Sequence, residues 1–129
     1  MGQKKSQGFF RKDIIILIKS ENWQELQDAF YRILPFGTGG RRGKMGVGPN
    51  RINDATITES AQGLSNFLKK KGKEGKMKAV IAFDTRKNSK RFAWIAANVF
   101  AANGIDALVL IVISVILVIA AIIAFNKRN

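Results

Sequence analysis

Apolar side chains recur every three or four residues after Ser20, which is the spacing of an amphipathic helix. The pattern predicts a helix over residues 21–34, with Ser20 as its N-cap and acidic residues early, where the helix dipole favours them. Pro35 then ends this helix, because proline disfavours helical geometry in the residue before it. The apolar run Ile14–Ile18 fits either a short strand or the first turns of a helix, and we expect residues 1–12 to be frayed. The apolar positions of the predicted helix are Trp23, Leu26, Ala29, Phe30 and Ile33.

A second helix, a strand and a third helix are predicted further along the chain. Thr56 and Glu59 form the capping-box pattern at the start of the second helix, and Gly72 supplies its stop. Residues 79–83 have the sequence of a buried strand, and Ser89 is the expected N-cap of the third helix. Helix, strand and helix joined by short loops predict an α/β layer with a partly parallel sheet. The expected apolar faces contain Ile57, Ala61, Leu64 and Leu68 in the second helix and Phe92, Ile95, Ala96, Val99 and Phe100 in the third.

The last part of the chain is strongly apolar. Ala107–Phe125 carries no charge, and Ser114 is its only polar residue. A helix of roughly 19 residues is about 28 Å long, close to the ~30 Å of a hydrocarbon core. The pattern therefore predicts a transmembrane helix over residues 107–125, with residues 126–128 as an interfacial anchor. A buried strand and an apolar cover over an exposed sheet edge are the alternatives.

The composition excludes several kinds of chemistry. The chain has 129 residues, which is enough for one domain, and it contains neither cysteine nor histidine. Disulfides, thiolate metal sites and Ser-His-Asp or Cys-His catalysis are therefore excluded within it. The net charge of +13 predicts attraction to phosphates, nucleic acid or an anionic membrane. We do not expect nucleic acid as a partner, because most cations lie at helix ends and turns without interleaved aromatic residues for base stacking.

The run Phe36–Asn53, FGTGGRRGKMGVGPNRIN, is rich in glycine and contains several cations. It is not a P-loop, because Thr38 stands where the first glycine is needed and Met45 where serine or threonine is needed. A dinucleotide-binding fingerprint is also excluded, because a helix and not a strand is predicted before the glycines. Two interpretations of this glycine-rich run stay open. One is an anion-binding loop in which glycine amides and the guanidinium groups of Arg41 and Arg42 contact an oxyanion, and the other is a solvated basic loop.

Four blocks stand in a fixed order within residues 28–105: FGTGGRRG, GPNRIN, the helix containing QGL, and DTRKNSKRFA. In sequence and spacing they resemble the amino-terminal domain of the α-D-phosphohexomutases, with the closest likeness to the phosphoglucomutase/phosphomannomutase group. The resemblance implies a partial α/β/α layer of phosphohexomutase domain I with a mixed sheet. It also implies an isomerase of carbohydrate metabolism that interconverts hexose 1-phosphate and hexose 6-phosphate. In this family a phosphoserine transfers its phosphoryl group to the sugar, and a bound Mg²⁺ neutralises charge.

The resemblance also implies which residues face phosphate. Arg42 matches an arginine near the family's phosphoserine, and the turn before it brings it there. Arg86 matches a basic position beside the same cleft. Arg41 departs from the family pattern, and we attach no function to it. The phosphate-facing candidates are Thr38, Gly39, Gly40, Arg42 and Arg86.

After Ile105 the sequence departs from the family pattern, and the blocks that hold the catalytic serine and the metal-binding aspartates are absent. We therefore expect a basic segment over residues 1–19, a partial domain I over residues 20–105 and an apolar tail over residues 106–129. On this reading the chain is a truncated mutase whose tail is read in a changed frame, and it is inactive alone, without a catalytic residue, metal ligand or cofactor of its own.

The alternative function is a small basic membrane-anchored protein that binds anionic ligands or lipid headgroups. If the tail is real, we expect association with a membrane through Ala107–Phe125, with the basic domain in the cytoplasm. Otherwise we expect a cytoplasmic protein. In either case the partner implied by the family resemblance is a hexose phosphate.

Overall fold

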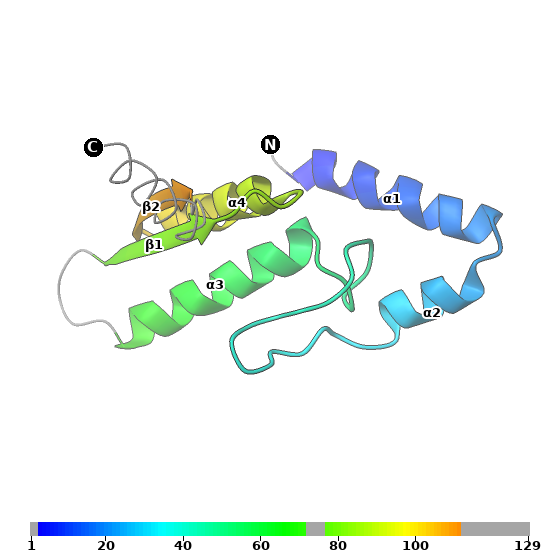
Figure 1. Ribbon diagram of the computed structural model, residues 1–129, viewed down its shortest axis with the longest axis horizontal. Helices are drawn as coiled ribbons and strands as arrows, with labels where there is room; N and C mark the ends of the chain where they lie inside the picture. The colour runs from blue at the N-terminus through cyan, green and yellow to red at the C-terminus, as the bar shows by residue number, and fades with distance from the viewer. Residues whose placement is uncertain (1–2, 72–76, 112–129) are drawn as a thin grey trace, which may run out of the picture. The chain divides into compact units, whose positions relative to one another are not determined.

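The computed structural model describes residues 3–71 and 77–111 (Figure 1). They contain four helices and two strands in the order α1, α2, α3, β1, α4, β2. The chain divides into two compact units, with the boundary between Thr56 and Ile57 near the start of α3. The structure is therefore of the α/β class, and each unit is considered separately.

The first unit begins with two helices that contact each other, α1 (Gln3–Lys19) and α2 (Trp23–Phe30). The helical alternative for Ile14–Ile18 is confirmed, since this run lies inside α1. Our expectation of fraying over residues 1–12 is wrong from Gln3 onward, because glutamine, lysine and arginine are good helix formers and carry the helix toward the N-terminus.

The second helix is shorter than predicted and has a different N-cap. Asn22, and not Ser20, caps α2, because the Asn22 side chain accepts a hydrogen bond from the Glu25 amide at 3.2 Å. The Ser20 hydroxyl instead donates to the Leu17 carbonyl in the last turn of α1. At the other end α2 stops at Phe30, five residues before Pro35. Tertiary hydrogen bonds to its last turn, described below, decide this end.

α3 (Asp54–Lys71) starts earlier than the capping-box pattern predicts. Asn53 occupies the capping position: its side-chain oxygen accepts from the Thr56 amide at 3.1 Å, and the Thr56 hydroxyl accepts from the Asn53 amide at 3.0 Å. This is a reciprocal capping arrangement in which Thr56 takes the inner position that we assigned to Glu59. On the helix, Ala61 and Ser65 are buried, whereas the predicted face residue Leu64 is 47% exposed.

In the second unit, β1 (Lys78–Phe83) and β2 (Asp106–Ile111) form a two-stranded parallel sheet, joined by α4 (Ser89–Ala102). The register places Lys78 opposite Asp106 and Phe83 opposite Ile111. α4 packs against both strands, and a short turn at Asn103 and Gly104 leads into β2. The strand predicted at residues 79–83 and the partly parallel sheet are confirmed, and the described residues contain no antiparallel strand. The buried apolar residues of α4 and of the turn that follows it are Ala93, Ala97, Phe100 and Ile105.

The predicted transmembrane helix over Ala107–Phe125 is wrong at its beginning, because residues 107–111 belong to β2. Valine, leucine and isoleucine suit a strand as well as a lipid-facing helix, and here their backbone groups are paired with β1. The remaining residues, 112–125, lie outside the described part of the chain. Among the described residues no helix is both long and apolar enough to cross a bilayer. The membrane attachment and membrane location that we based on Ala107–Phe125 therefore find no support.

Candidate functional site

Thr38, Gly39 and Gly40 lie in one tight turn of the loop between α2 and α3 (Figure 1). Gly37 and Gly40 close this turn through two backbone hydrogen bonds of 3.1 Å, one in each direction. The φ angles of Gly39 and Gly40 are +83° and +115°, which a residue with a Cβ rarely adopts. The three predicted residues are thus brought together in a turn whose geometry requires glycine.

Arg42 follows the turn with an exposed side chain. Its guanidinium lies beside the turn, since a Cβ placed on Gly39 would be 3.8 Å from Arg42 Nη2. Within the described residues, Arg42 makes no hydrogen bond or ion pair. An exposed guanidinium with no partner among these residues has its donors free for a bidentate contact with an oxyanion.

The neighbouring Arg41 is held within the protein. Its Nη1 donates to the Thr56 carbonyl at 3.2 Å, and its guanidinium lies over the Phe36 ring, 5.1 Å from the centroid. Arg41 thus connects the turn to the first turn of α3. Of the two arginines that we considered from the sequence for an anion-binding loop, Arg41 is thus engaged within the protein, whereas Arg42 is exposed.

Arg51 is a third arginine in this loop, and its side chain is only 2% exposed. It makes five hydrogen bonds, which is the number of N–H donors in a guanidinium group. Both Nε and Nη2 donate to Glu25, at 2.9 and 2.6 Å, and Nη2 also donates to the Asp28 carboxylate at 2.6 Å. Burial lowers the pKa of Arg51, but the hydrogen bonds and charges of the two carboxylates outweigh it, so that the pKa is raised and the group stays charged.

The motif GPNRIN, which contains Arg51, attaches the loop to the C-terminal end of α2. The last carbonyls of a helix lack partners within the helix. Here the Asn50 side chain donates to the Asp28 carbonyl at 2.8 Å, and its amide donates to the Ala29 carbonyl at 3.0 Å. Asn53 donates to the carbonyls of Gly46 and Gly48, both at 2.9 Å.

Sequence reasoning missed these roles of Asn50, Arg51 and Asn53 and used GPNRIN only as a mark of resemblance. The available signal was a run of polar side chains after a short helix whose terminal carbonyls need donors.

Arg86 belongs to the second unit, in the loop between β1 and α4, and its side chain is 86% exposed. It is not free: its Nε donates to Asp84 Oδ2 at 2.6 Å, and its amide donates to Oδ1 at 3.1 Å. The amide hydrogen bond from Arg86 is the main reason why the pKa of Asp84 is lowered. An anion that binds Arg86 has to compete with this carboxylate.

The N-cap of α4 also differs from our prediction. Asn88 precedes the helix in a left-handed conformation with φ +67°, and its side chain makes no capping hydrogen bond. The Ser89 hydroxyl instead accepts from the Asp84 amide at 3.2 Å. Ser89 therefore ties the loop to the end of β1.

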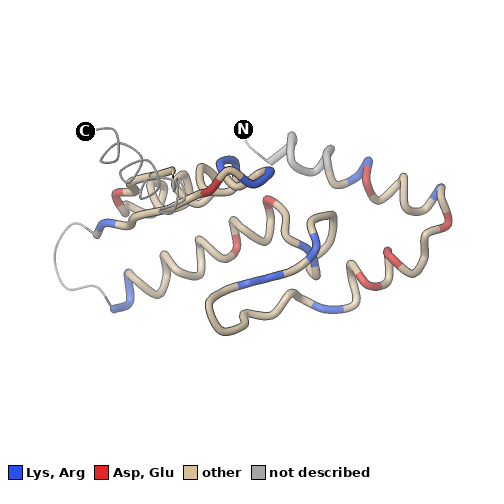
Figure 2. Tube along the Cα trace, in the orientation of Figure 1, with Lys and Arg blue, Asp and Glu red and all other residues tan. Residues whose placement is uncertain are grey.

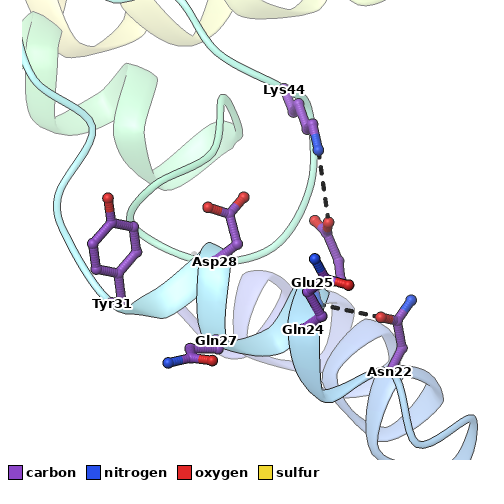
Figure 3. A pocket seen from close by; sticks show the side chains of 7 residues that line it. All are labelled: Asn22, Gln24, Glu25, Gln27, Asp28, Tyr31 and Lys44. Carbon is purple, nitrogen blue, oxygen red and sulfur yellow. Dashed lines mark hydrogen bonds and ion pairs between the residues drawn. The ribbon is translucent and has the colours of Figure 1, made fainter.

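An open pocket of about 700 Å³ lies beside α2 (Figure 3). In the close-up, Lys44 extends from the loop toward Glu25, and their charged atoms are 4.0 Å apart. Two carboxylates line the pocket, and negative charge disfavours a phosphate there. None of the five phosphate-facing candidates lines it. The lining residues are Asn22, Gln24, Glu25, Gln27, Asp28, Tyr31 and Lys44.

The described residues do not fit the Mg²⁺ site of the phosphohexomutases. In residues 3–71 and 77–111, no group of three or more acidic side chains gathers to hold a metal ion. Glu25 and Asp28, which are close together, are already bound to Arg51. We therefore assign no residue of the chain to the metal.

Residues 34–128 match the family model described as phosphoglucomutase/phosphomannomutase, alpha/beta/alpha domain I. The chain belongs to this family. The resemblance inferred from the four sequence blocks is confirmed. The match includes the turn, Arg42 and Arg86, and it extends past residue 105, where we ended the resemblance. No solved structure matches the chain significantly.

Curated relatives carry three related names. The chain is 41% identical to human phosphopentomutase over 96 residues, which are 69% of the chain and 16% of the relative. It is 40% identical to a phosphoglucomutase of Staphylococcus haemolyticus over 79 residues, 61% of the chain and 14% of the relative. It is 31% identical to a phosphoribomutase of Saccharomyces cerevisiae over 93 residues, 72% of the chain and 15% of the relative. The chain thus spans about one sixth of the length of these family members.

Proposed function

We propose that the chain acts as domain I of a sugar-phosphate mutase and binds a phosphoryl group at the turn Thr38–Gly40 and Arg42. The observation that carries this proposal is the exposed Arg42 guanidinium, which has no partner among the described residues and lies beside a glycine turn in the family-matched segment. Most cations elsewhere in the loop are already engaged: Arg51 is buried with two carboxylates, and Arg41 is bound to the start of α3. Arg42 remains available.

The turn suits an oxyanion for two physical reasons. Glycine lets backbone N–H groups approach an anion closely, and a guanidinium group binds two phosphate oxygens at once. The turn is also fixed before any ligand arrives, by its own backbone hydrogen bonds and by the contacts of Arg41. Donors that are already in place lose little entropy on binding and stabilise charge that develops during phosphoryl transfer.

The role that we infer for the domain is to bind and position a phosphoryl group, and we assign it no nucleophile. The names of the relatives include glucose, ribose and pentose mutases. The sequence resemblance implied a hexose phosphate as the substrate. We therefore widen the proposed substrate to the phosphate of either a hexose or a pentose. Arg86 is a second, weaker candidate for phosphate contact, because Asp84 occupies its guanidinium.

Phosphate binding can be tested by recording the amide signals of the ¹⁵N-labelled chain while inorganic phosphate is added at constant ionic strength. We expect saturable shifts of the Gly39 and Gly40 amides and of the Arg42 Nε–H signal. Arg42→Met should abolish the shifts, because it removes the guanidinium group and keeps a similar aliphatic stem. Lys70→Met on α3 is the matched control, since it removes the same charge from an exposed position outside the loop. Equal phosphate binding by Arg42→Met and the wild-type chain would refute the proposal.

The same titration with glucose 1-phosphate and with ribose 1-phosphate distinguishes the two sugar classes. Tighter binding of one ester than of inorganic phosphate would show that the sugar is also recognised. Equal binding of all three would limit the role of this turn to the phosphoryl group.

A further inference from the structure

Arg51 is buried against α2, whereas the glycine-rich turn in the same loop is exposed. Four of the five hydrogen bonds of Arg51 join two segments: Glu25 and Asp28 lie on α2, whereas Arg51 lies between the glycine-rich turn and α3. The fifth goes to the carbonyl of the adjacent Asn50. A buried charge is costly unless it is fully paired, and removal of one partner leaves the other uncompensated. The position of this part of the loop relative to α2 is therefore strongly constrained.

The backbone around Arg51 is in turn bound to the segment that follows Arg42. The Ile52 amide donates to the Lys44 carbonyl at 2.8 Å, and the Gly46 amide donates to the Ile52 carbonyl at 3.3 Å. The aliphatic part of Arg51 lies against Gly46, where an added Cβ would be 3.6 Å from its Cγ and Cδ. Only one residue separates Lys44 from Arg42, so a shift of Arg51 moves the backbone that aims the Arg42 side chain.

The other side of the loop is held at Leu34. The Leu34 amide donates to the Pro49 carbonyl at 2.9 Å, and the Leu34 methyl groups fill the space beside Gly43. Residues 35–43 therefore leave and rejoin the body of the unit at fixed points. Pro49, which provides one of these points, lies two residues before Arg51 in the sequence. Lys44, which provides another, is hydrogen-bonded to Ile52, the residue after Arg51.

From these contacts we propose that Arg51, clamped between Glu25 and Asp28, is a positioning residue for the phosphate-binding turn. This inference rests on the proposed function for its consequence in binding, but its structural part can be measured without a ligand. A guanidinium is needed because its planar group donates hydrogen bonds to both carboxylates and to two carbonyls at once, which a lysine ammonium cannot do. Glu25 and Asp28, which line the pocket beside α2, therefore help to position the phosphate-binding turn through Arg51.

The test compares Arg51→Lys with Val47→Ala in the full chain. Arg51→Lys keeps the charge and removes the planar group, whereas Val47→Ala removes buried apolar volume from the same loop and leaves the hydrogen-bonding groups of Arg51, Glu25 and Asp28 unchanged. Without phosphate, we expect Arg51→Lys to shift the Gly39, Gly40 and Arg42 signals and to speed hydrogen exchange of the Gly40 amide. Val47→Ala should lower the melting temperature and leave these signals in place. Unchanged turn signals in a folded Arg51→Lys chain would overturn the inference.

Phosphate titration of the same variants separates this inference from the proposed function. If Arg51 positions the turn, Arg51→Lys should weaken binding of inorganic phosphate by at least about fivefold, the lower end of typical coupling between sites. Val47→Ala should stay within about twofold of the wild-type affinity. A wild-type chain that binds no phosphate would refute the proposed function, while the measurement without ligand would still decide the role of Arg51.

A milder variant covers the case in which Arg51→Lys does not fold. Glu25→Gln keeps a side-chain oxygen that accepts a hydrogen bond from Arg51 and leaves the Asp28 ion pair in place. We expect it to shift the turn signals in the same direction and by a smaller amount. A folded Glu25→Gln chain with wild-type turn signals and wild-type phosphate affinity would contradict the clamp.

Discussion

Charge alone does not decide which arginine of the loop is available to a ligand. Arg41, Arg42 and Arg51 carry the same charge within one loop, where Figure 2 shows several cations between α2 and α3. Arg41 is bound to the α3 backbone, Arg51 is buried with two carboxylates, and Arg42 is exposed. Each outcome depends on partners elsewhere in the chain: Glu25 lies 26 residues from Arg51. The position of a cation in the sequence therefore indicates a basic loop, whereas its tertiary partners determine its role.

Gly48 is the glycine of this loop where a side chain is least tolerable. Its φ angle is +108°, and an added Cβ would collide with the carbonyl oxygen of Ala29. We expect Gly48→Ala to destabilise the first unit by about 2–3 kcal/mol, because the strained backbone and the collision add together. Urea unfolding followed by Trp23 fluorescence, in a Trp94→Phe background, measures this loss.

Gly104→Ala is the control for the strain alone. Gly104 also has a positive φ, +74°, but an added Cβ would meet no atom within 4 Å. Its cost should be about 1 kcal/mol, measured by urea unfolding followed by Trp94 fluorescence in a Trp23→Phe background. If Gly48→Ala lost no more free energy of unfolding than Gly104→Ala, the loop would have to move away from the Ala29 carbonyl and so relieve the collision.

The first residues of the helices differ from the predicted ones, although the helices themselves are predicted correctly. The sequence predicts a helix around Trp23, the strand at residues 79–83 and the helix after Ser89, and all three are present. It places the N-caps at Ser20, Thr56 and Ser89, whereas the structure has Asn22, Asn53 and Asn88. The three predicted hydroxyls are used in other hydrogen bonds, to Leu17, Asn53 and Asp84. Local patterns thus find the helices, but they do not show which of several nearby polar side chains caps each one: Asn22 and Asn53 accept from the amide three residues later, in place of the predicted hydroxyls.

Asn53 joins α3 to the loop, so its removal should cost more than the loss of an ordinary cap. Its side chain accepts from the Thr56 amide and donates to the Gly46 and Gly48 carbonyls. We expect Asn53→Ala to lower the free energy of unfolding by about 2–3 kcal/mol, from a lost cap and two carbonyls without their donor. Chemical denaturation followed by circular dichroism measures the change.

Asn22→Ala provides the matched comparison, because Asn22 caps α2 through one exposed hydrogen bond. Its removal should cost about 1 kcal/mol or less. If the two variants were equally destabilised, the bonds from Asn53 to the glycine carbonyls would contribute nothing to stability, and the loop would be held by other contacts.

On the scale of the whole molecule, hydropathy could not distinguish a strand from a membrane helix at residues 107–111. The same aliphatic side chains suit both, and the difference lies in pairing with β1, which is more than 20 residues away in the sequence. Along β2 half-buried and exposed residues alternate from Asp106 to Leu110, as in a strand with one face covered by α4. The family resemblance, in contrast, could be read from the sequence, because its motifs are local.

Within the described residues α4 packs against the sheet, which gives a prediction for two nearby aliphatic residues. Ile105 is 1% exposed and lies between α4 and β2, whereas Leu108 is 57% exposed on the strand that follows. Ile105→Ala should therefore destabilise the second unit by about 2–5 kcal/mol, because it leaves a cavity in a small core. Leu108→Ala should change the free energy of unfolding by no more than about 1 kcal/mol, since little apolar area is lost from the interior. Urea titrations without detergent compare the two, and a larger loss for Leu108→Ala than for Ile105→Ala would mean that a second layer covers the outer face of β2.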